Sequence, residues 1–295
     1  MLAVAVGLLG ALVYGSADFV GGIASKRISP IRVTAIGGVS GLVVLLVAYL
    51  VIGGVWSTRA VLLGALSGVS GSLAIVLLYA CLAIGPMSIL SPVTAVVSAI
   101  VPMLAGVFRG ERLHTVGYVA LLIALVAVVL VGFVPEKGAV RPSVRALTMA
   151  VVSGGLIGLF LIIVDLTPDD SGVVPLIANR TVSSVIMFAV VGGLILLGQK
   201  RAPDAAAGSP IGFLSRGWRA GFWLAALGGA IDASANAILL FGLRLGELTI
   251  QSVLTALYPA GTIILAAVLL RERIAPVQVV GLVLALVAAA LLAIA

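Results

Sequence analysis

The chain alternates between long apolar runs and short charged islands. Each apolar run has roughly 18 to 25 residues, which is enough for a helix to cross the hydrocarbon core of a bilayer. No run shows the alternation with period two that a barrel strand requires, and a backbone in lipid must satisfy its own hydrogen bonds. The pattern predicts ten membrane-spanning helices at about 2–23, 31–52, 60–83, 87–107, 115–134, 144–166, 173–198, 219–243, 248–270 and 274–295.

Composition agrees with a protein that lives in a membrane. The chain is 62% hydrophobic and 9% charged, and its mean hydropathy is +1.35. Such a sequence is too apolar to keep its surface in water, which predicts an all-α integral membrane protein. The formal charge of +7 comes from Lys and Arg beside the spans, where such residues orient helices and contact anionic lipid headgroups. There is no basic helix or aromatic-rich basic patch, so we expect no nucleic-acid partner.

The chain contains an internal duplication. Residues 82–130 recur as residues 243–291 without a gap, and about 20 of the 49 positions are identical. The match includes polar positions, such as Glu111 with Glu272 in the turn before the last span of each copy. Shared apolar composition alone would not give this agreement, so the protein is predicted to consist of two halves of similar build.

A polar segment at residues 135–143 separates the two halves. The prediction is an N-terminal repeat at 1–138 and a C-terminal repeat at 139–295, with five spans in each. An odd number of spans makes the second repeat start on the opposite side of the membrane, so the repeats are inverted. Transporters built from inverted repeats place their substrate site near the bilayer midplane, where the repeats meet.

Two acidic residues lie deep within predicted spans. Asp18 is about two-thirds along the first span, and Asp232 is near the middle of the eighth. A carboxylate in lipid needs a polar cavity, a partner or a proton, so both residues are candidates for the substrate cavity and for proton coupling. For Asp18 the alternative is a position near the interface, and for Asp232 it is a hydrogen bond between helices. Asn236 shares the helix face of Asp232.

Arg180 also lies within an apolar run, about five residues from its start. The sequence leaves open whether its side chain reaches the interface or pairs with an acid such as Asp165. We interpret it as a coupling or structural charge.

Polar side chains form a stripe on one face of the fourth span, and a comparable stripe recurs in the ninth. The two stripes comprise Ser91, Thr94 and Ser98, and Gln251, Ser252, Thr255 and Tyr258. Hydroxyl stripes commonly join membrane helices. Here they recur in both halves beside prolines that loosen the helix, so the hypothesis is that they line the cavity.

The sequence contains no catalytic or cofactor-binding motif that we recognise. It has no metalloprotease, nucleophile-elbow or P-loop pattern, and His114 and Cys81 are each the single residue of their type. We therefore expect no enzyme activity, no metal and no cofactor. Without a nucleotide-binding motif, any energy for transport would come from an ion or proton gradient.

The chain resembles the EamA-type transporters of the drug/metabolite transporter superfamily. The resemblance is carried by the ten spans, the Tyr14-Gly-Ser motif of the first span, Pro175 followed by Arg180, and the Glu-Arg turn in each half. It implies a carrier of the bacterial inner membrane whose repeats surround a central cavity, to which Tyr14 is assigned. Typical members export amino acids or related metabolites by alternating access. The alternatives are a flippase for lipid-linked substrates and a non-transporting membrane subunit or sensor.

Charge and resemblance predict opposite orientations. Members of the family usually place both termini in the cytoplasm, which would leave four basic residues in cytoplasmic loops: Arg59, Arg109, Arg112 and Arg244. The opposite orientation places twelve there: Lys26, Arg27, Arg32, Lys137, Arg141, Arg145, Lys200, Arg201, Arg216, Arg219, Arg271 and Arg273. The positive-inside rule favours termini outside the cytoplasm.

Overall fold

The computed structural model describes residues 1–25, 27–28, 30–84, 87–132, 142–199, 219, 221–271 and 274–294. Throughout this part of the chain the regular structure is helical. The helices are α1 (Leu2–Ser25), α2 (Pro30–Ile52), α3 (Thr58–Ile84), α4 (Met87–Phe108), α5 (Thr115–Gly132), α6 (Val144–Asp165), η1 (Asp169–Ser171), α7 (Val174–Gln199), α9 (Phe222–Leu245), α10 (Leu248–Thr255), α11 (Tyr258–Leu269) and α12 (Pro276–Ile294). Glu272, most of the predicted linker at 135–143, and the basic residues Lys26, Lys137, Arg141, Lys200, Arg201, Arg216 and Arg273 lie outside the described residues.

Ten spans in the described residues are long and apolar enough to cross a membrane, as the sequence predicts. The ninth is interrupted, because α10 ends at Thr255 and α11 begins at Tyr258. Pro259 lies in the first turn of α11, where its missing N–H has no intrahelical partner to lose. The fourth span carries Pro92 and Pro102 but remains one helix. Proline therefore divides the span in one repeat only.

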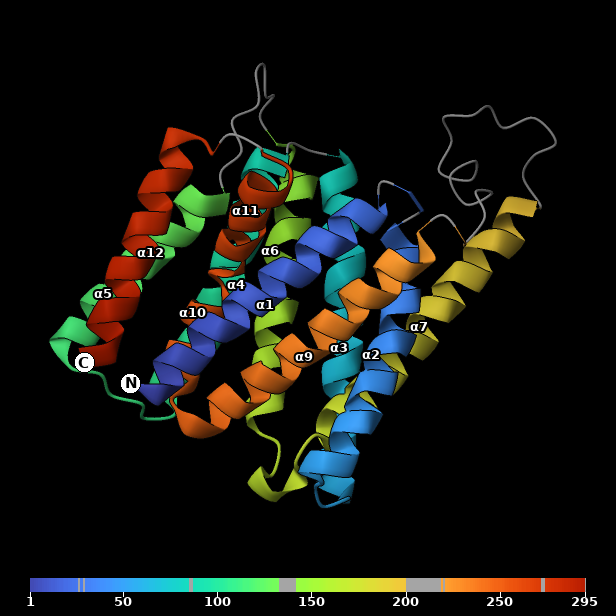
Figure 1. Ribbon diagram of the computed structural model, residues 1–295, viewed down its shortest axis with the longest axis horizontal. Coiled ribbons are helices and arrows are strands. Elements are labelled where there is room, and N and C mark those ends of the chain that lie inside the picture. The colour runs from blue at the N-terminus through green and yellow to red at the C-terminus, as the bar shows by residue number, and fades with distance from the viewer. Residues whose placement is uncertain are drawn as a thin grey trace.

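The two halves interlock, and the pattern of contacts repeats when the halves are exchanged. α1 packs extensively on α9, and its repeat counterpart α6 packs in the same way on α3. Likewise α2 packs on α9 and α7 on α3, while α4 packs on α6 and α11 on α1. The pairs α5–α12 and α2–α7 form opposite edges of the bundle (Figure 1). This arrangement confirms two inverted five-helix repeats, and it shows that the sequence halves are not two separate bodies.

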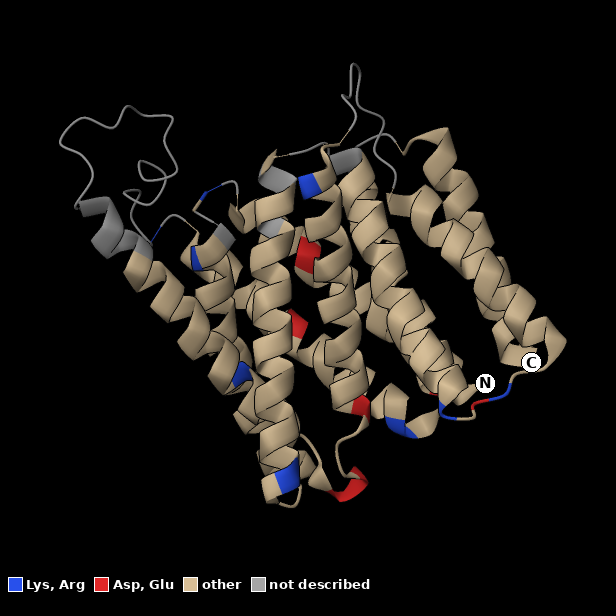
Figure 2. Ribbon diagram, turned by 180° about the vertical axis from the view of Figure 1, so that it is seen from behind, with Lys and Arg blue, Asp and Glu red and all other residues tan. Residues whose placement is uncertain are grey.

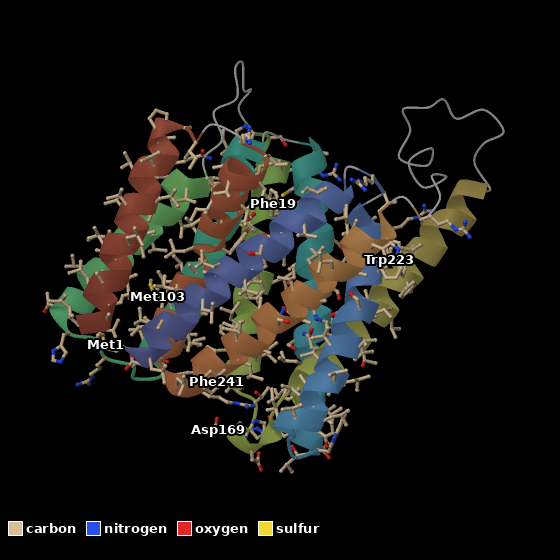
Figure 3. All side chains as sticks on the ribbon, viewed as in Figure 1. Met1, Phe19, Met103, Asp169, Trp223 and Phe241 are labelled. Atoms are coloured by element: carbon tan, nitrogen blue, oxygen red, sulfur yellow. The ribbon has the colours of Figure 1, made fainter. Side chains whose placement is uncertain are left out.

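The surface of the bundle has the polarity expected in a bilayer. The N- and C-termini lie at the same end, and the η1 turn with Asp169 lies at that end as well (Figures 1 and 3). Acidic and basic positions gather mainly near the ends of the helices (Figure 2). Large apolar side chains are exposed near the ends of α9, at Trp223 and Phe241 (Figure 3), and in the middle of spans, at Val43 of α2 and Leu122 of α5. The exposed middle of the bundle therefore suits lipid.

Small residues bring the helices of the two halves into backbone contact. A Cβ on Gly229 of α9 would lie 2.2 Å from Cα of Gly37 in α2, and a Cβ on Gly64 of α3 would lie 2.3 Å from the carbonyl oxygen of Pro175. A Cβ on Gly154 of α6 would lie 2.6 Å from the carbonyl oxygen of Thr94. Glycine lacks a side chain, which permits such close approach between membrane helices.

Candidate functional site

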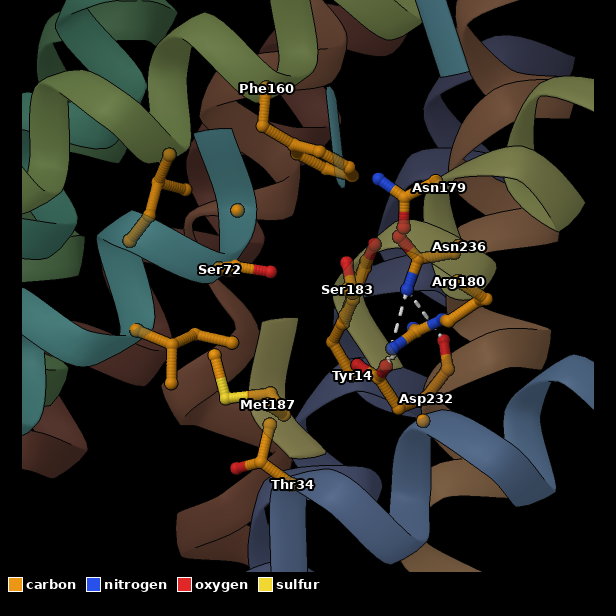
Figure 4. Close-up of a pocket in the computed structure, with 14 residues that line it drawn as sticks. Tyr14, Thr34, Ser72, Phe160, Asn179, Arg180, Ser183, Met187, Asp232 and Asn236 are labelled. Carbon is orange, nitrogen blue, oxygen red and sulfur yellow. Dashed lines mark hydrogen bonds and ion pairs between the residues drawn. The ribbon is translucent and has the colours of Figure 1, made fainter. Parts of the chain in front are cut away.

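A cavity of about 180 Å³ lies within the bundle (Figure 4). Its residues come from α1, α2, α3, α6, α7 and α9, so both halves contribute. The polar group comprises Tyr14, Asn179, Arg180, Ser183, Asp232 and Asn236. The large apolar residues are Ile75, Ile157, Phe160 and Met187. Figure 4 shows the polar group gathered on one side of the cavity, with Ser72 opposite. The cavity therefore combines a polar wall with an apolar one.

An ion pair between Arg180 of α7 and Asp232 of α9 forms the centre of the polar wall. The Asp232 side chain is 33% exposed and that of Arg180 16%. Asn236 donates from Nδ2 to the Asp232 backbone carbonyl at 2.8 Å and to its Oδ2 at 3.4 Å. Of the alternatives for Arg180, the structure therefore selects an acid partner within the bundle. Asp165 pairs instead with Arg109, at 2.5 Å.

Close helix packing places the Arg180 side chain. A Cβ on Gly41 of α2 would lie 3.6 Å from Nε of Arg180 and 3.1 Å from the Cβ of Ala233, beside Asp232. On the other side of α7, Asn179 donates from Nδ2 to Ser67 Oγ at 2.8 Å. A Cβ on Gly68 would meet the Asn179 carbonyl oxygen at 2.6 Å. Small residues on α2 and α3 thus hold α7 in the position from which Arg180 reaches α9.

A second cavity of about 140 Å³ adjoins the first and contains Asp18. The two cavities share Thr34, Gly38, Ile75, Arg180 and Asp232. The second one extends toward the end of the bundle at which α1 ends and α2 and α9 begin, because its lining includes residues near those termini: Gly21, Val33 and Ala225. The Asp18 side chain is exposed, and it forms no hydrogen bond or ion pair with any residue that the structure describes.

The structure brings part of the predicted site together. Tyr14, Asp18, Arg180, Asp232 and Asn236 each line at least one of the two cavities. None of the seven stripe residues lines either cavity.

The buried residues of the stripe donate hydrogen bonds to backbone carbonyls. Thr94 donates to Leu90 and Ala150, and Ser98 to Ala95. Gln251 donates to Ala3, and Ser252 to Thr249. Ser91, Thr255 and Tyr258 are half-buried. In this conformation the stripe thus contributes to contacts within and between helices.

Several cavity residues were not predicted from the sequence. Asn179, Ser183 and Met187 follow each other at four-residue spacing on α7, next to Arg180, and they line one helix face. The spacing of Asn179 and Ser183 beside Arg180 is visible in the sequence, and it would have predicted a polar face at this part of α7. Thr34, Ser72 and Phe160 carry no comparable pattern, because each joins the cavity through the packing of its helix.

Hydrogen bonds within the second half and between the halves join the end of the bundle that carries the termini. Arg244 of α9 donates from Nη2 to the backbone carbonyl of Gly172 at 2.9 Å and to Ser171 Oγ at 3.2 Å, which holds the turn between α6 and α7. The Glu111 carboxylate, from the first half, accepts the backbone N–H groups of Leu248 and Thr249 at 3.0 and 2.9 Å. A carboxylate at the start of α10 is favourable. It accepts hydrogen bonds from backbone N–H groups that have no partner within the helix, and its negative charge lies at the positive end of the helix dipole.

Glu247 lies directly before α10, outside the membrane-spanning segments. Partial burial raises the pKa of its carboxyl, and the charge of Glu111 raises this pKa further. Its Oε2 is buried, and no group in the described part of the chain donates a hydrogen bond to it. The end of the bundle that carries the termini therefore holds two carboxylates that repel one another.

Ten spans in two inverted repeats, with a partly polar cavity between them, define a helical membrane protein of the transporter class. The model of the EamA-like transporter family matches residues 1–133 and 144–294. The chain belongs to this family, and it is a membrane transporter of the drug/metabolite transporter type.

Solved structures include proteins of the same fold. One, described only as "Crystal structure of protein", is 15% identical, with a TM-score of 0.72 over 98% of this chain and 95% of that chain. At this identity the likeness concerns the fold alone. The comparison with curated proteins found no match.

Proposed function

We propose that the protein is a secondary transporter of the bacterial inner membrane that exports a small amphipathic metabolite by alternating access. The observation that carries this proposal is the cavity formed by six helices from both halves, with polar and apolar residues on different walls. A ligand with a polar group and an apolar body can satisfy both walls at once. Amino acids and related metabolites have this character.

The position of the second cavity supports export. It extends toward the end of the bundle at which the described residues Arg27, Arg145, Arg219 and Arg271 lie. The positive-inside rule assigns that end to the cytoplasm, and the contacts of Arg244 and Glu111 close the other end. In this conformation a substrate would enter from the cytoplasm.

The two carboxylates of the cavities support coupling to protons. Asp18 and Asp232 belong to different halves, and neither has an acidic counterpart in the other repeat; Gly71 stands opposite Asp232 at the offset of 161. A carboxyl group within the bundle that can bind and release a proton could link transport to a gradient. Asp232 is also the partner of Arg180, so loss of its charge would free the arginine during the transport cycle.

A test uses purified protein in liposomes, with labelled amino acids, amines, nucleosides and sugars as candidate substrates. We expect the wild type to move at least one of them. Ser183→Trp, which fills the cavity, should prevent transport, whereas Asp170→Asn in the exposed turn before α7 should not. Equal transport by the wild type and Ser183→Trp would contradict the cavity as the route. Movement of lipid-linked cargo alone would show a flippase.

The same liposomes test coupling. Asp232→Asn should lose transport driven by a pH gradient, yet retain substrate exchange, if the carboxyl carries the proton. Loss of substrate binding as well would show that Asp232 holds the substrate. Gradient-driven transport at the wild-type rate in both Asp232→Asn and Asp18→Asn would exclude coupling through these two residues.

A further inference from the structure

The residues that line the two cavities include two carboxylates but only one cationic side chain. Their charged members are Asp18, Asp232 and Arg180. Arg180 is paired with Asp232, and Asn236 completes the contacts of that acid. With both carboxylates ionised, the lining therefore has a net charge of −1, which resides on Asp18.

Among the described residues that line the cavities, none neutralises Asp18. Tyr14, one turn earlier on α1, and Thr34 of α2 supply neutral polar groups to the cavities. Arg32 is two residues from Thr34 in the sequence, but it lines neither cavity. Arg180 is shared with Asp232. A carboxylate in the membrane region without a partner is unfavourable, and a cation brought by a ligand would remove this penalty.

We propose that the cavity selects small amphipathic organic monocations, such as amines or quaternary ammonium compounds. The charged group would lie at Asp18 in the second cavity. The apolar body would pass Ile75, which lines both cavities, to reach the wall formed by Phe160 and Met187. This inference rests on the proposed function, because it assumes that the two cavities are the substrate site.

The test must separate a bound organic cation from a bound proton. A fixed charge does so, and the probe is phenethyltrimethylammonium, which is cationic at every pH. Its neutral analogue carries a tert-butyl group in place of the trimethylammonium group and has nearly the same shape. Binding of both is measured by calorimetry on the protein in nanodiscs, with empty nanodiscs as the blank.

We expect the wild type to bind the cation at least about tenfold more tightly than the neutral analogue, as for a charge-assisted contact in a cavity. Asp18→Asn should abolish this preference, and Asp18→Glu should retain it. Asp18→Ser serves as a second neutral variant, should the amide prevent folding. Asp170→Asn removes an acid outside the cavities and should leave the preference unchanged.

Absence of cation binding, or an equal preference in the wild type and both neutral variants, would overturn the inference. Ser183→Trp separates this result from failure of the proposed function. If the wild type binds both probes equally and Ser183→Trp binds neither, the cavity is a binding site without selection for charge. If Ser183→Trp binds both as well as the wild type, the cavity is not the site, and both proposals are wrong.

Discussion

The contact between Gly229 and Gly37 permits a quantitative test of the packing that places the ion pair. A Cβ on Gly229 would lie 2.2 Å from Cα, 2.3 Å from O and 2.5 Å from C of Gly37, whereas ordinary contact begins at 3.4 Å. All three atoms belong to the backbone, so no side-chain rotation can relieve the overlap. In Gly229→Ala, α2 and α9 must therefore move apart by about 1 Å.

Overpacking of this kind costs about 1–3 kcal/mol, and alanine recovers up to about 1 kcal/mol through its higher helix propensity. We expect a net destabilisation of about 1–2 kcal/mol, measured as a lower melting temperature in detergent. Asp232 is three residues further along α9, so its contact with Arg180 should weaken and transport should fall as well.

Gly155→Ala provides the matched control. Gly155 lies in α6, and no heavy atom outside its own backbone surroundings lies within 4 Å of its ideal Cβ. This substitution should raise the melting temperature slightly, because only the helix propensity changes. Equal melting temperatures for Gly229→Ala and Gly155→Ala would refute the argument that backbone contact between α2 and α9 determines the structure here.

Three other predictions concern charge and access. Arg180→Gln should destabilise the protein by about 2–3 kcal/mol, because it leaves Asp232 unpaired. Adding Asp232→Asn should recover part of this loss. If the two substitutions lower the melting temperature additively, Arg180 and Asp232 do not stabilise each other. Glu247→Gln should raise the melting temperature at neutral pH, because the raised pKa means that ionisation of this carboxyl opposes folding. The gain should disappear as the pH falls below the unfolded-state pKa, and a gain independent of pH would contradict this cause. In a chain without its native cysteine, Ser183→Cys should react with a small water-soluble maleimide, because Ser183 lines the cavity. Gln251→Cys should be protected, because Gln251 is fully buried. The reverse order of labelling would place the cavity along α10.

The stripe of hydroxyl groups shows where sequence patterns stop being informative. Thr94 and Ser98 share a face of α4 with the spacing expected of cavity residues, yet both are buried. Each donates to a carbonyl of its own helix, Leu90 and Ala95 respectively. A hydroxyl group can always find such an acceptor one turn away, so it can face a neighbouring helix without a ligand. Periodicity gives the face of a helix, but not what that face meets.

Charged groups were more informative, because a charge in lipid has few ways to be satisfied. This reasoning identified Asp18, Asp232 and Arg180 as site candidates from one sequence, and all three line a cavity. It could not assign the partner of Arg180, because both neighbouring spans in the sequence offer an acid. Asp165 belongs to the preceding span and Asp232 to the following one. The partner depends on which helices lie beside α7.

The sequence by itself determined the ten spans and their inverted arrangement. Apolar runs of this length must form helices in lipid, where the backbone has no other hydrogen-bond partner, and an offset repeat of five spans must be inverted. The tertiary structure decided which helices of the two halves became neighbours, and so which residues share the cavity. Contacts such as Gly37 with Gly229 join positions far apart in the chain. They depend on the close fit of two helix surfaces, which hydrophobic periodicity does not encode.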